Sequence, residues 1–160
     1  MRPIAYSLQF RGNATLLHED HLRLRLTAPS AALVTTIDEA GIRCAFGDIA
    51  GGEASLEAEL TLGVLESVDH GCIEFGHGNS VWFRNSAAQL VRCPDPHLEH
   101  GAVIREVEGG EGQFAGAEGL ITSNFFISDT GDVTENHFGL IFVRTQEDDQ
   151  QAAPCAALGG

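Results

Sequence analysis

Hydrophobic and polar residues alternate along most of this chain with the two-residue period of a β-strand. In His21–Ala28, one side carries Leu22, Leu24 and Leu26, and the other carries a histidine and two arginines. The longer segment Ala54–Glu66 separates its leucines from serine, glutamate and threonine in the same way. A helix would scatter these leucines around its circumference, so the pattern predicts two half-buried strands.

Shorter β-prone runs, separated by turn residues, fill much of the remaining chain. They are Ile4–Phe10, Ala14–Leu17, Leu33–Ile37, Ile42–Phe46, Cys72–Phe75, Ser80–Arg84, Ala87–Cys93 and His100–Val107. Arg11–Asn13 is predicted to be a turn, and Pro29–Ala32 a break at which a short helical turn can start. About eight to ten short strands with little helix are typical of closed antiparallel barrels and of sandwiches.

The most regular pair of runs is Leu120–Ser128 and Val133–Val143, on either side of the turn Asp129–Asp132. Gly131 can adopt the positive φ of a tight reversal, which predicts a β-hairpin centred on Thr130 and Gly131. Both faces of this hairpin are rich in apolar residues, and such a hairpin needs burial on both sides. The pattern therefore predicts a barrel with a filled interior, whose outer face contacts another subunit.

This register gathers polar side chains on one face of the hairpin. Asn124 lies opposite His137, and Phe126 lies opposite Glu135. A histidine beside a carboxylate can move protons near neutral pH, and an amide can hold a carbonyl or enolate oxygen. Asn124, Glu135 and His137 are therefore predicted as catalytic residues; the alternative is that they are solvated or bond one another at a subunit contact. A shift of one residue would exchange the two faces.

A second group of side chains, Glu74, Trp82 and Asn85, flanks a predicted turn at Gly76–Asn79. Together with Phe126, these residues are predicted to bind a substrate. The alternative is that the aromatic side chains belong to the core, where large aromatic residues are common in strands.

Two His-x-x-His spacings occur, at His18/His21 and at His97/His100. In a strand or a proline-rich loop this spacing does not place both rings on one side, and zinc needs three or four converging ligands. The four cysteines show no C-x-x-C spacing, which indicates reduced thiols. No bound metal is therefore predicted.

The length of 160 residues and the hydrophobic content of 43% predict one folded domain, assigned to residues 1–145. Residues 146–160 are acidic and small, and they are predicted to form a flexible tail. The formal charge of −14 argues against nucleic acid and anionic membranes as partners. No apolar run is long enough to span a bilayer, and Met1–Ile4 lacks the apolar core of a signal peptide. A cytoplasmic location is therefore predicted.

The segment Gly109–Gly119 reads G-G-E-G-Q-F-A-G-A-E-G. It resembles the G-G-x-G-x-F-x-G-A-x-G pattern of the allene oxide cyclase/dirigent barrel superfamily, where the pattern lies between two late strands. The glycines allow bulges and a sharp bend at a barrel corner, and Phe114 is predicted to plug one end of the core. A phosphate loop is the rival interpretation, but no Lys-Ser/Thr pair and no helical pattern follow the last glycine.

The resemblance implies an all-β fold, a small closed antiparallel eight-stranded β-barrel that assembles as a dimer or a trimer. Better-known members bind a reactive intermediate in the lumen and steer its cyclisation or coupling without a cofactor. The working residues of the plant cyclase have no matching positions in this sequence, so none is transferred.

The predicted function is a cofactor-free cyclase or isomerase. Its substrate would be an apolar, unsaturated small molecule in the lumen, such as a natural-product or oxylipin-like intermediate. The alternatives are a non-catalytic, dirigent-like carrier of a hydrophobic small molecule and a metal-dependent barrel enzyme.

Overall fold

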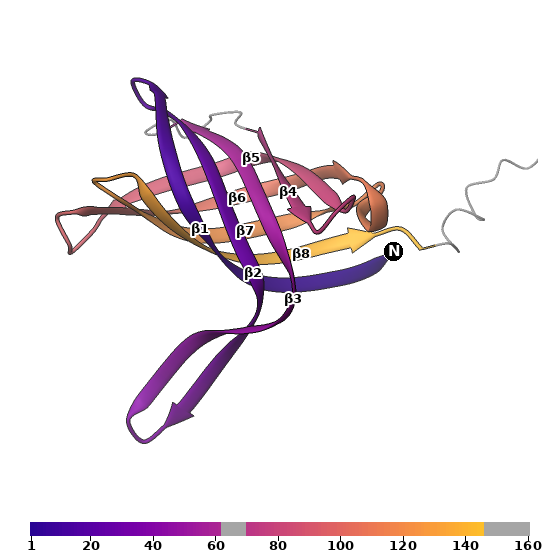
Figure 1. Cartoon of the computed structure of the whole chain (residues 1–160), viewed down its shortest axis with the longest axis horizontal. Coiled ribbons are helices and arrows are strands. Elements are labelled where there is room, and N and C mark those ends of the chain that lie inside the picture. The colour runs from indigo at the N-terminus through magenta and orange to yellow at the C-terminus, as the bar shows by residue number, and fades with distance from the viewer. Residues whose placement is uncertain (62–69, 146–160) are drawn as a thin grey trace, which may run out of the picture.

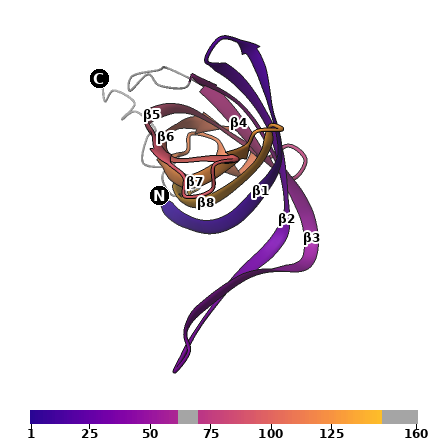
Figure 2. The ribbon, with the colours of Figure 1, turned by 90° about the vertical axis from the view of Figure 1, so that its left-hand side faces the viewer.

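The computed structural model describes residues 1–61 and 70–145, and this part of the chain is all-β. Eight antiparallel strands form one ring-like sheet, in which each strand pairs with the next and β8 pairs with β1 (Figures 1 and 2). The elements are β1 (Arg2–His18), β2 (His21–Asp38), β3 (Gly41–Thr61), β4 (His70–Phe75), β5 (Ser80–Arg92), β6 (Leu98–Gly110), the 3-10 turn η1 (Gly112–Phe114), β7 (Glu118–Ser128) and β8 (Asp132–Val143). The predicted all-β architecture is confirmed. The tail predicted at 146–160 and the end of the long alternating segment at 62–66 lie outside the described residues.

Alternate residues of the strands fill the interior of the ring. The three leucines of His21–Ala28 are buried, and so are Leu56 and Leu60 of β3. On the outer face of the same two strands, Arg23 pairs with Glu59 at 2.9 Å. The half-buried strand at His21–Ala28 is therefore confirmed, and the one at Ala54–Glu66 is confirmed as far as Thr61, with apolar side chains inside and ion pairs outside.

Four predicted breaks are continuous strand instead: Arg11–Asn13 in β1, Pro29–Ala32 in β2, residues 47–53 in β3 and residues 85–86 in β5. β1 runs through Arg11–Asn13, and a Cβ on Gly12 would lie 2.2 Å from the carbonyl oxygen of Arg25. This glycine therefore lets β1 and β2 approach closely and does not reverse the chain. β2 continues through Pro29–Ala32, where a shift in its register with β3 accommodates the proline.

The register of the β7–β8 hairpin differs from the predicted one by a single residue. Ser123 lies opposite His137, so the predicted pairing of Asn124 with His137 is wrong. The connection is one residue longer than predicted, because Ile127 and not Ser128 lies opposite Val133. Within it, the N–H of Gly131 donates to the carbonyl of Ser128 at 2.9 Å, as in a β-turn. Since successive strand residues point to opposite faces, the shift places Ser123 and Phe125, in place of Asn124 and Phe126, on the face that carries Glu135 and His137.

The glycine-rich segment forms the corner between β6 and β7. Gly112 and Gly116 have φ values of 62° and 64°, a backbone conformation that favours glycine. Phe114 is only 3% exposed, and its ring centroid lies 5.3 Å from that of Phe75. As predicted, Phe114 belongs to the core and sits at one end of it.

The distal halves of β2 and β3 leave the ring as a two-stranded ribbon, which we call the arm (Figures 1 and 2). Its strands form eight cross-strand pairs, from Ala31–Asp48 to Asp38–Gly41. β1 pairs with β2 only from Arg11 onward, so in the described part of the chain residues 2–10 pair with β8 alone. The sheet is therefore open between the first half of β1 and the base of the arm.

Candidate functional site

Four polar side chains meet in the interior of the ring, and we call them the buried polar cluster. Arg105 comes from β6, Ser123 from β7, and Glu135 and His137 from β8, and each is at most 2% exposed. All four occupy inward positions of their strands, where apolar residues are the rule. Burying a charge costs several kcal/mol, on the order of 3–5 when it is unpaired, so the partners of these groups decide whether the interior is stable.

One carboxylate oxygen is the centre of this cluster. Glu135 Oε1 lies 2.6 Å from Arg105 Nη1, 2.6 Å from Ser123 Oγ and 3.2 Å from His137 Nε2. Arg105 Nη1 also donates to Ser123 Oγ at 3.1 Å, and its guanidinium carbon lies 5.0 Å from the centre of the Phe83 ring. The guanidinium is thus held by an opposite charge on one side and an aromatic face on another.

The protonation of Glu135 follows from these contacts. Burial acts to raise the pKa of its carboxyl, but the charge of Arg105 and the hydrogen bonds from His137 and Ser123 outweigh it. The pKa of Glu135 therefore lies well below its usual value, and the residue is a carboxylate at neutral pH.

His137 is neutral at the same pH. Burial lowers the pKa of its imidazole, and the nearby Arg105 lowers it further, against the opposing effect of Glu135. His137 Nε2 lies 3.2 Å from Glu135 Oε1 and 3.3 Å from Arg105 Nη1. We assign the neutral tautomer with the proton on Nε2, donated to the carboxylate, because both N–H groups of Arg105 Nη1 are directed to Glu135 and Ser123. Nδ1 is then an acceptor, and it faces the hydroxyl of Tyr6 at 3.5 Å.

Tyr6 connects the buried polar cluster to a surface cavity, which we call the mouth pocket. This open cavity of about 680 Å³ lies between the first half of β1, the base of the arm and η1. Its lining includes Tyr6, Phe75, Phe114, Leu33, Ile49 and Phe138. Burial raises the pKa of the Tyr6 phenol well above its usual value, so the hydroxyl keeps its proton at neutral pH.

A glycine makes the position of the Tyr6 ring possible. Tyr6 and Gly139 are cross-strand partners in β1 and β8, and a Cβ on Gly139 would lie 2.0 Å from Tyr6 Cε1. The Tyr6 ring therefore lies over the backbone of Gly139, two residues along β8 from His137. It packs edge-on against the Phe75 ring, with 5.0 Å between the ring centroids.

The structure brings together two of the three predicted catalytic residues. Glu135 and His137 lie in contact inside the ring, whereas Asn124 is exposed on the outer face of β7. Its neighbour Ser123 takes the inward position, a consequence of the one-residue shift described above. Sequence reasoning missed Arg105, although a charge in alternation with the buried Val103 and Val107 is the signal that marks it.

The predicted substrate-binding residues are dispersed. Asn85 is inside, 5% exposed, and its amide donates to the carbonyl of Glu59 at 3.5 Å. Trp82 and Phe126 are 41% and 39% exposed on the outer face, and Glu74 is also exposed. The reason is strand alternation, which turns Val81, Phe83 and Asn85 of β5 inward and Trp82 outward.

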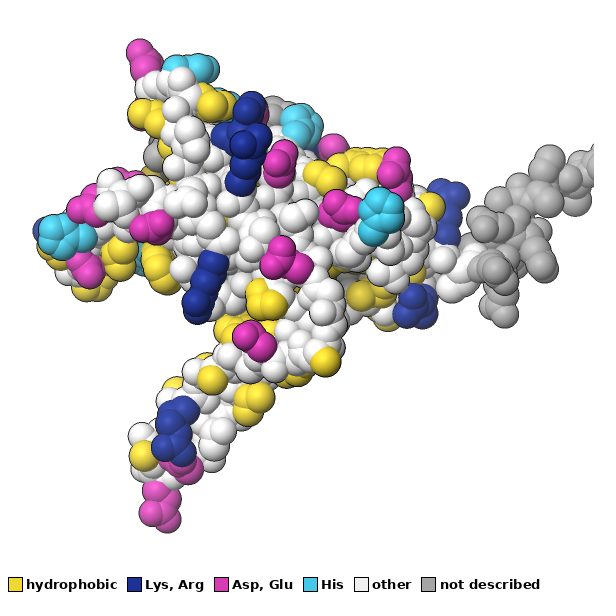
Figure 3. Space-filling view, in the orientation of Figure 1, with side chains coloured by type: hydrophobic (Ala, Val, Ile, Leu, Met, Phe, Trp, Pro, Cys, Tyr) yellow, Lys and Arg dark blue, Asp and Glu magenta, His cyan; other side chains and the backbone are white. Residues whose placement is uncertain are grey.

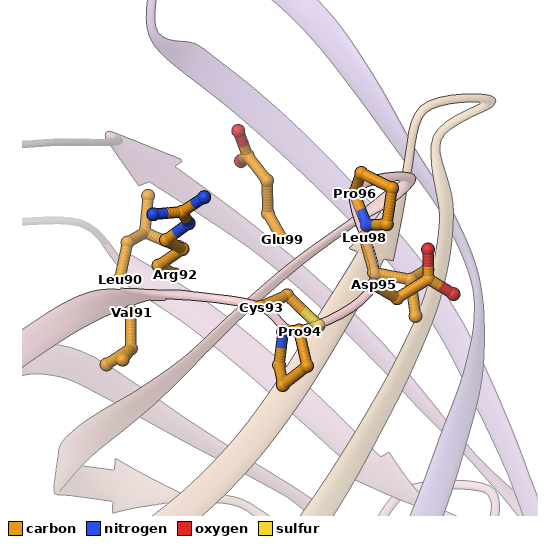
Figure 4. Close-up of a pocket in the computed structure, with 9 residues that line it drawn as sticks. All are labelled: Leu90, Val91, Arg92, Cys93, Pro94, Asp95, Pro96, Leu98 and Glu99. Carbon is orange, nitrogen blue, oxygen red and sulfur yellow. The ribbon is translucent and has the colours of Figure 1, made fainter.

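Other cavities lie away from the cluster. Glu74 lines a shallow cavity of about 410 Å³ on the outer face of β2–β4, with Arg25, Glu57 and Cys72. A cavity of about 780 Å³ lies within the bent tip of the β5–β6 hairpin (Figure 4), lined by Leu90–Pro96, Leu98 and Glu99. These tip residues are exposed or half-buried, and no buried titratable side chain lines the cavity.

Within residues 1–61 and 70–145, no three side chains of His, Cys, Asp or Glu converge as metal ligands. His18 and His21 stack at 5.3 Å beside the β1–β2 turn, and His97 bonds Asp129 at 3.1 Å. Cys44, Cys72 and Cys93 are free thiols. In the same residues, no helix has the length and hydrophobicity needed to cross a membrane.

No family model matches this sequence, and neither the curated proteins nor the solved structures contain a significant match.

Proposed function

We propose that this chain is a cofactor-free cyclase or isomerase, built on a closed barrel of the allene oxide cyclase/dirigent kind. Its substrate is an apolar, unsaturated small molecule. One observation carries the proposal: Tyr6 lines the mouth pocket and its hydroxyl contacts His137 of the buried polar cluster. A ligand in this largely apolar pocket meets the Tyr6 side chain, with a histidine and a carboxylate behind it.

The ligand is placed in the mouth pocket and not deeper in the ring. Large apolar side chains such as Phe10 and Phe83 are completely buried in the interior, and Phe114 covers one end of it. The mouth pocket, at about 680 Å³, is in the size range of small-molecule sites. Its aromatic side chains favour a folded, unsaturated chain over an extended polar one.

The cluster supplies a path for one proton. The phenol oxygen of Tyr6 accepts a hydrogen bond from an enol or hydroxyl of the substrate, while the phenol proton points to His137 Nδ1. When the substrate loses its proton to the phenol oxygen, the phenol proton moves to Nδ1. The resulting imidazolium is stabilised by Glu135, whose carboxylate is 3.2 Å from Nε2. It then returns the proton through the phenol to the product, so the reaction has no net loss of a proton and His137 is neutral again. Most of the rate would come from holding the reacting atoms close, which needs few polar groups.

A non-catalytic carrier is the second candidate, and a specific observation favours it. The charges of Arg105 and Glu135 are bonded to each other at 2.6 Å, and neither residue lines the mouth pocket. Such a pair can serve stability alone, in which case Tyr6 only orients a bound ligand.

A ring-closure assay separates these candidates. The purified chain is incubated with an unsaturated fatty-acid epoxide as a probe, and the cyclic product and its enantiomers are measured by chiral chromatography. Turnover that Tyr6→Phe lowers at least tenfold supports the enzyme, because this variant keeps the ring and removes only the hydroxyl. Trp82→Phe, on the outer face, is the matched control and should leave turnover unchanged.

Binding of the probe with no turnover supports the carrier instead. Mass spectrometry of small molecules extracted from the purified chain then identifies the natural ligand. If the probe does not bind, and no apolar molecule co-purifies, both candidates fail.

A further inference from the structure

The arm carries an uncovered apolar face. Cross-strand partners point to the same side of a ribbon, and the pairing of the arm places six side chains together: Leu33, Thr35, Ile37, Ile42, Cys44 and Phe46. None of them is charged, and Ile37 and Ile42 are 79% and 69% exposed. The ion pair between Arg43 and Asp38 lies on the opposite side of the ribbon.

An isolated two-stranded ribbon is only marginally stable in water, and exposed apolar surface of this kind marks an interaction site. Apolar side chains lie along the arm as it projects into solvent (Figure 3). The arm therefore requires a partner surface that the other described residues, in 1–61 and 70–145, do not provide.

A second apolar surface lies on the outer side of β6–β8, and we call it the outer patch. Its members are Ile104, Leu120, Phe138, Leu140 and Phe142, which are between 39% and 56% exposed. Leu120 and Leu140 are cross-strand partners, as are Thr122 and Phe138. On β2 and β3, the outward-facing positions are occupied by arginine–glutamate pairs. The outer patch therefore carries apolar side chains where another part of the outer face carries charged ones.

The two surfaces border one open space. The mouth pocket is lined by Ala31 and Leu33, on the apolar side of the arm, and by Phe138 of the outer patch. We propose that the arm of one copy of this chain seats its apolar face on the outer patch of a second copy, and that the second copy returns the contact.

The lack of charge on the contacting side chains agrees with a second copy as the occupant. With a formal charge of −14, each chain repels another at long range, so a contact between copies has to be made by apolar side chains. The six side chains of the arm face and the five of the outer patch are uncharged, and acidic residues on the same faces, Asp48 opposite Ala31 and Glu106 opposite Leu120, border them. A basic partner would be attracted to the acidic surface instead.

Symmetry and size agree with this choice. A two-fold pair covers both surfaces of both copies with a single type of contact. Eight strand pairs make a ribbon face roughly 26 Å by 10 Å, so two arms and two patches together bury about 1,000 Å², near the lower limit for a specific interface. This inference does not depend on the proposed function, because its test measures mass and not turnover.

The test is the mass of the full chain in solution, measured by light scattering during size exclusion. The wild type is expected at twice the chain mass of 17.0 kDa. Ile37→Asp on the apolar face and Leu140→Asp in the outer patch should each weaken the association at least a hundredfold. Thr36→Asp, next to Ile37 on the opposite side of the arm, is the matched control and should remain a dimer. Phe138→Asp replaces Leu140→Asp if circular dichroism shows that the latter does not fold.

Mixing the variants identifies the partner. A chain with Ile37→Asp keeps an intact patch, and a chain with Leu140→Asp keeps an intact arm, so the mixture should pair more tightly than either variant alone, through one intact contact. A monomeric wild type overturns the inference, and so does a Leu140→Asp chain that folds and still pairs. A mixture that pairs no more tightly than the separate variants overturns the arm-on-patch contact.

Discussion

Removal of Arg105 tests whether the buried polar cluster is held together by charge. In Arg105→Met, Glu135 keeps its 1% exposure but loses the guanidinium at 2.6 Å. At an effective dielectric constant near 20, two unit charges at this distance attract by roughly 6 kcal/mol. Ser123 and His137 remain beside the carboxylate, so the expected loss of unfolding free energy is about 3–5 kcal/mol.

Urea unfolding at pH 7, followed by far-ultraviolet circular dichroism, measures this loss. The double variant Arg105→Met/Glu135→Leu should recover more than half of it, because no unpaired charge remains inside. Arg23→Met removes an outer partner of Glu59 at 2.9 Å and should hardly move the midpoint, since solvent screens that pair.

The pH dependence of the same variant gives an independent check. Without Arg105, burial is the dominant influence on Glu135 and raises the pKa of its carboxyl. The folded state then takes up a proton more readily than the unfolded state, so the deficit relative to wild type should shrink as the pH falls from 7 to 5. A single variant that loses less than about 1 kcal/mol, or a double variant that loses the sum of its parts, would refute the reasoning.

Three further predictions concern neighbouring positions. Burial lowers the pKa of His137 in the folded state, so the contribution of its neutral imidazole to the unfolding free energy is full above about pH 6.5 and is lost as the pH falls below it. His137→Gln should therefore reduce the pH dependence of the unfolding free energy in urea titrations between pH 7 and 5. Ser123→Ala should lower the unfolding free energy by about 1.5–3 kcal/mol, since its hydroxyl donates to a buried carboxylate. Asn124→Ala on the outer face should change it by less than about 0.5 kcal/mol, and equal effects would contradict the assignment of Ser123 to the interior and Asn124 to the outer face. Gly139→Ala should cost about 1–3 kcal/mol by thermal unfolding because its Cβ meets the Tyr6 ring, and Tyr6→Ala in the same chain should remove most of that added cost.

The strands themselves could be predicted because their alternation is local. The leucines of His21–Ala28 and the apolar side of β3 need only the period of two to identify their buried face. The corner at Gly109–Gly119 could be predicted for a similar reason, since its positive φ angles are accessible to glycine and to few other residues.

The composition of the cluster depends on information that is not local. The width of one turn decides whether Ser123 or Asn124 faces inward, and the pattern of apolar residues fits either register. Tyr6 lies 131 positions before His137, and only closure of the ring through β1 and β8 brings them together. The arm could not be predicted either, because its strands alternate like those of the ring while contributing nothing to the interior.

The location of Trp82 determines what fluorescence can report about this protein. It is the single tryptophan of the chain, and its indole lies over Gly109 on the outer wall, where a Cβ would be 2.8 Å from Nε1. Its emission therefore reports separation of β5 from β6. A variant that disrupts the buried polar cluster while β5 and β6 stay paired will have the same tryptophan emission as the wild type.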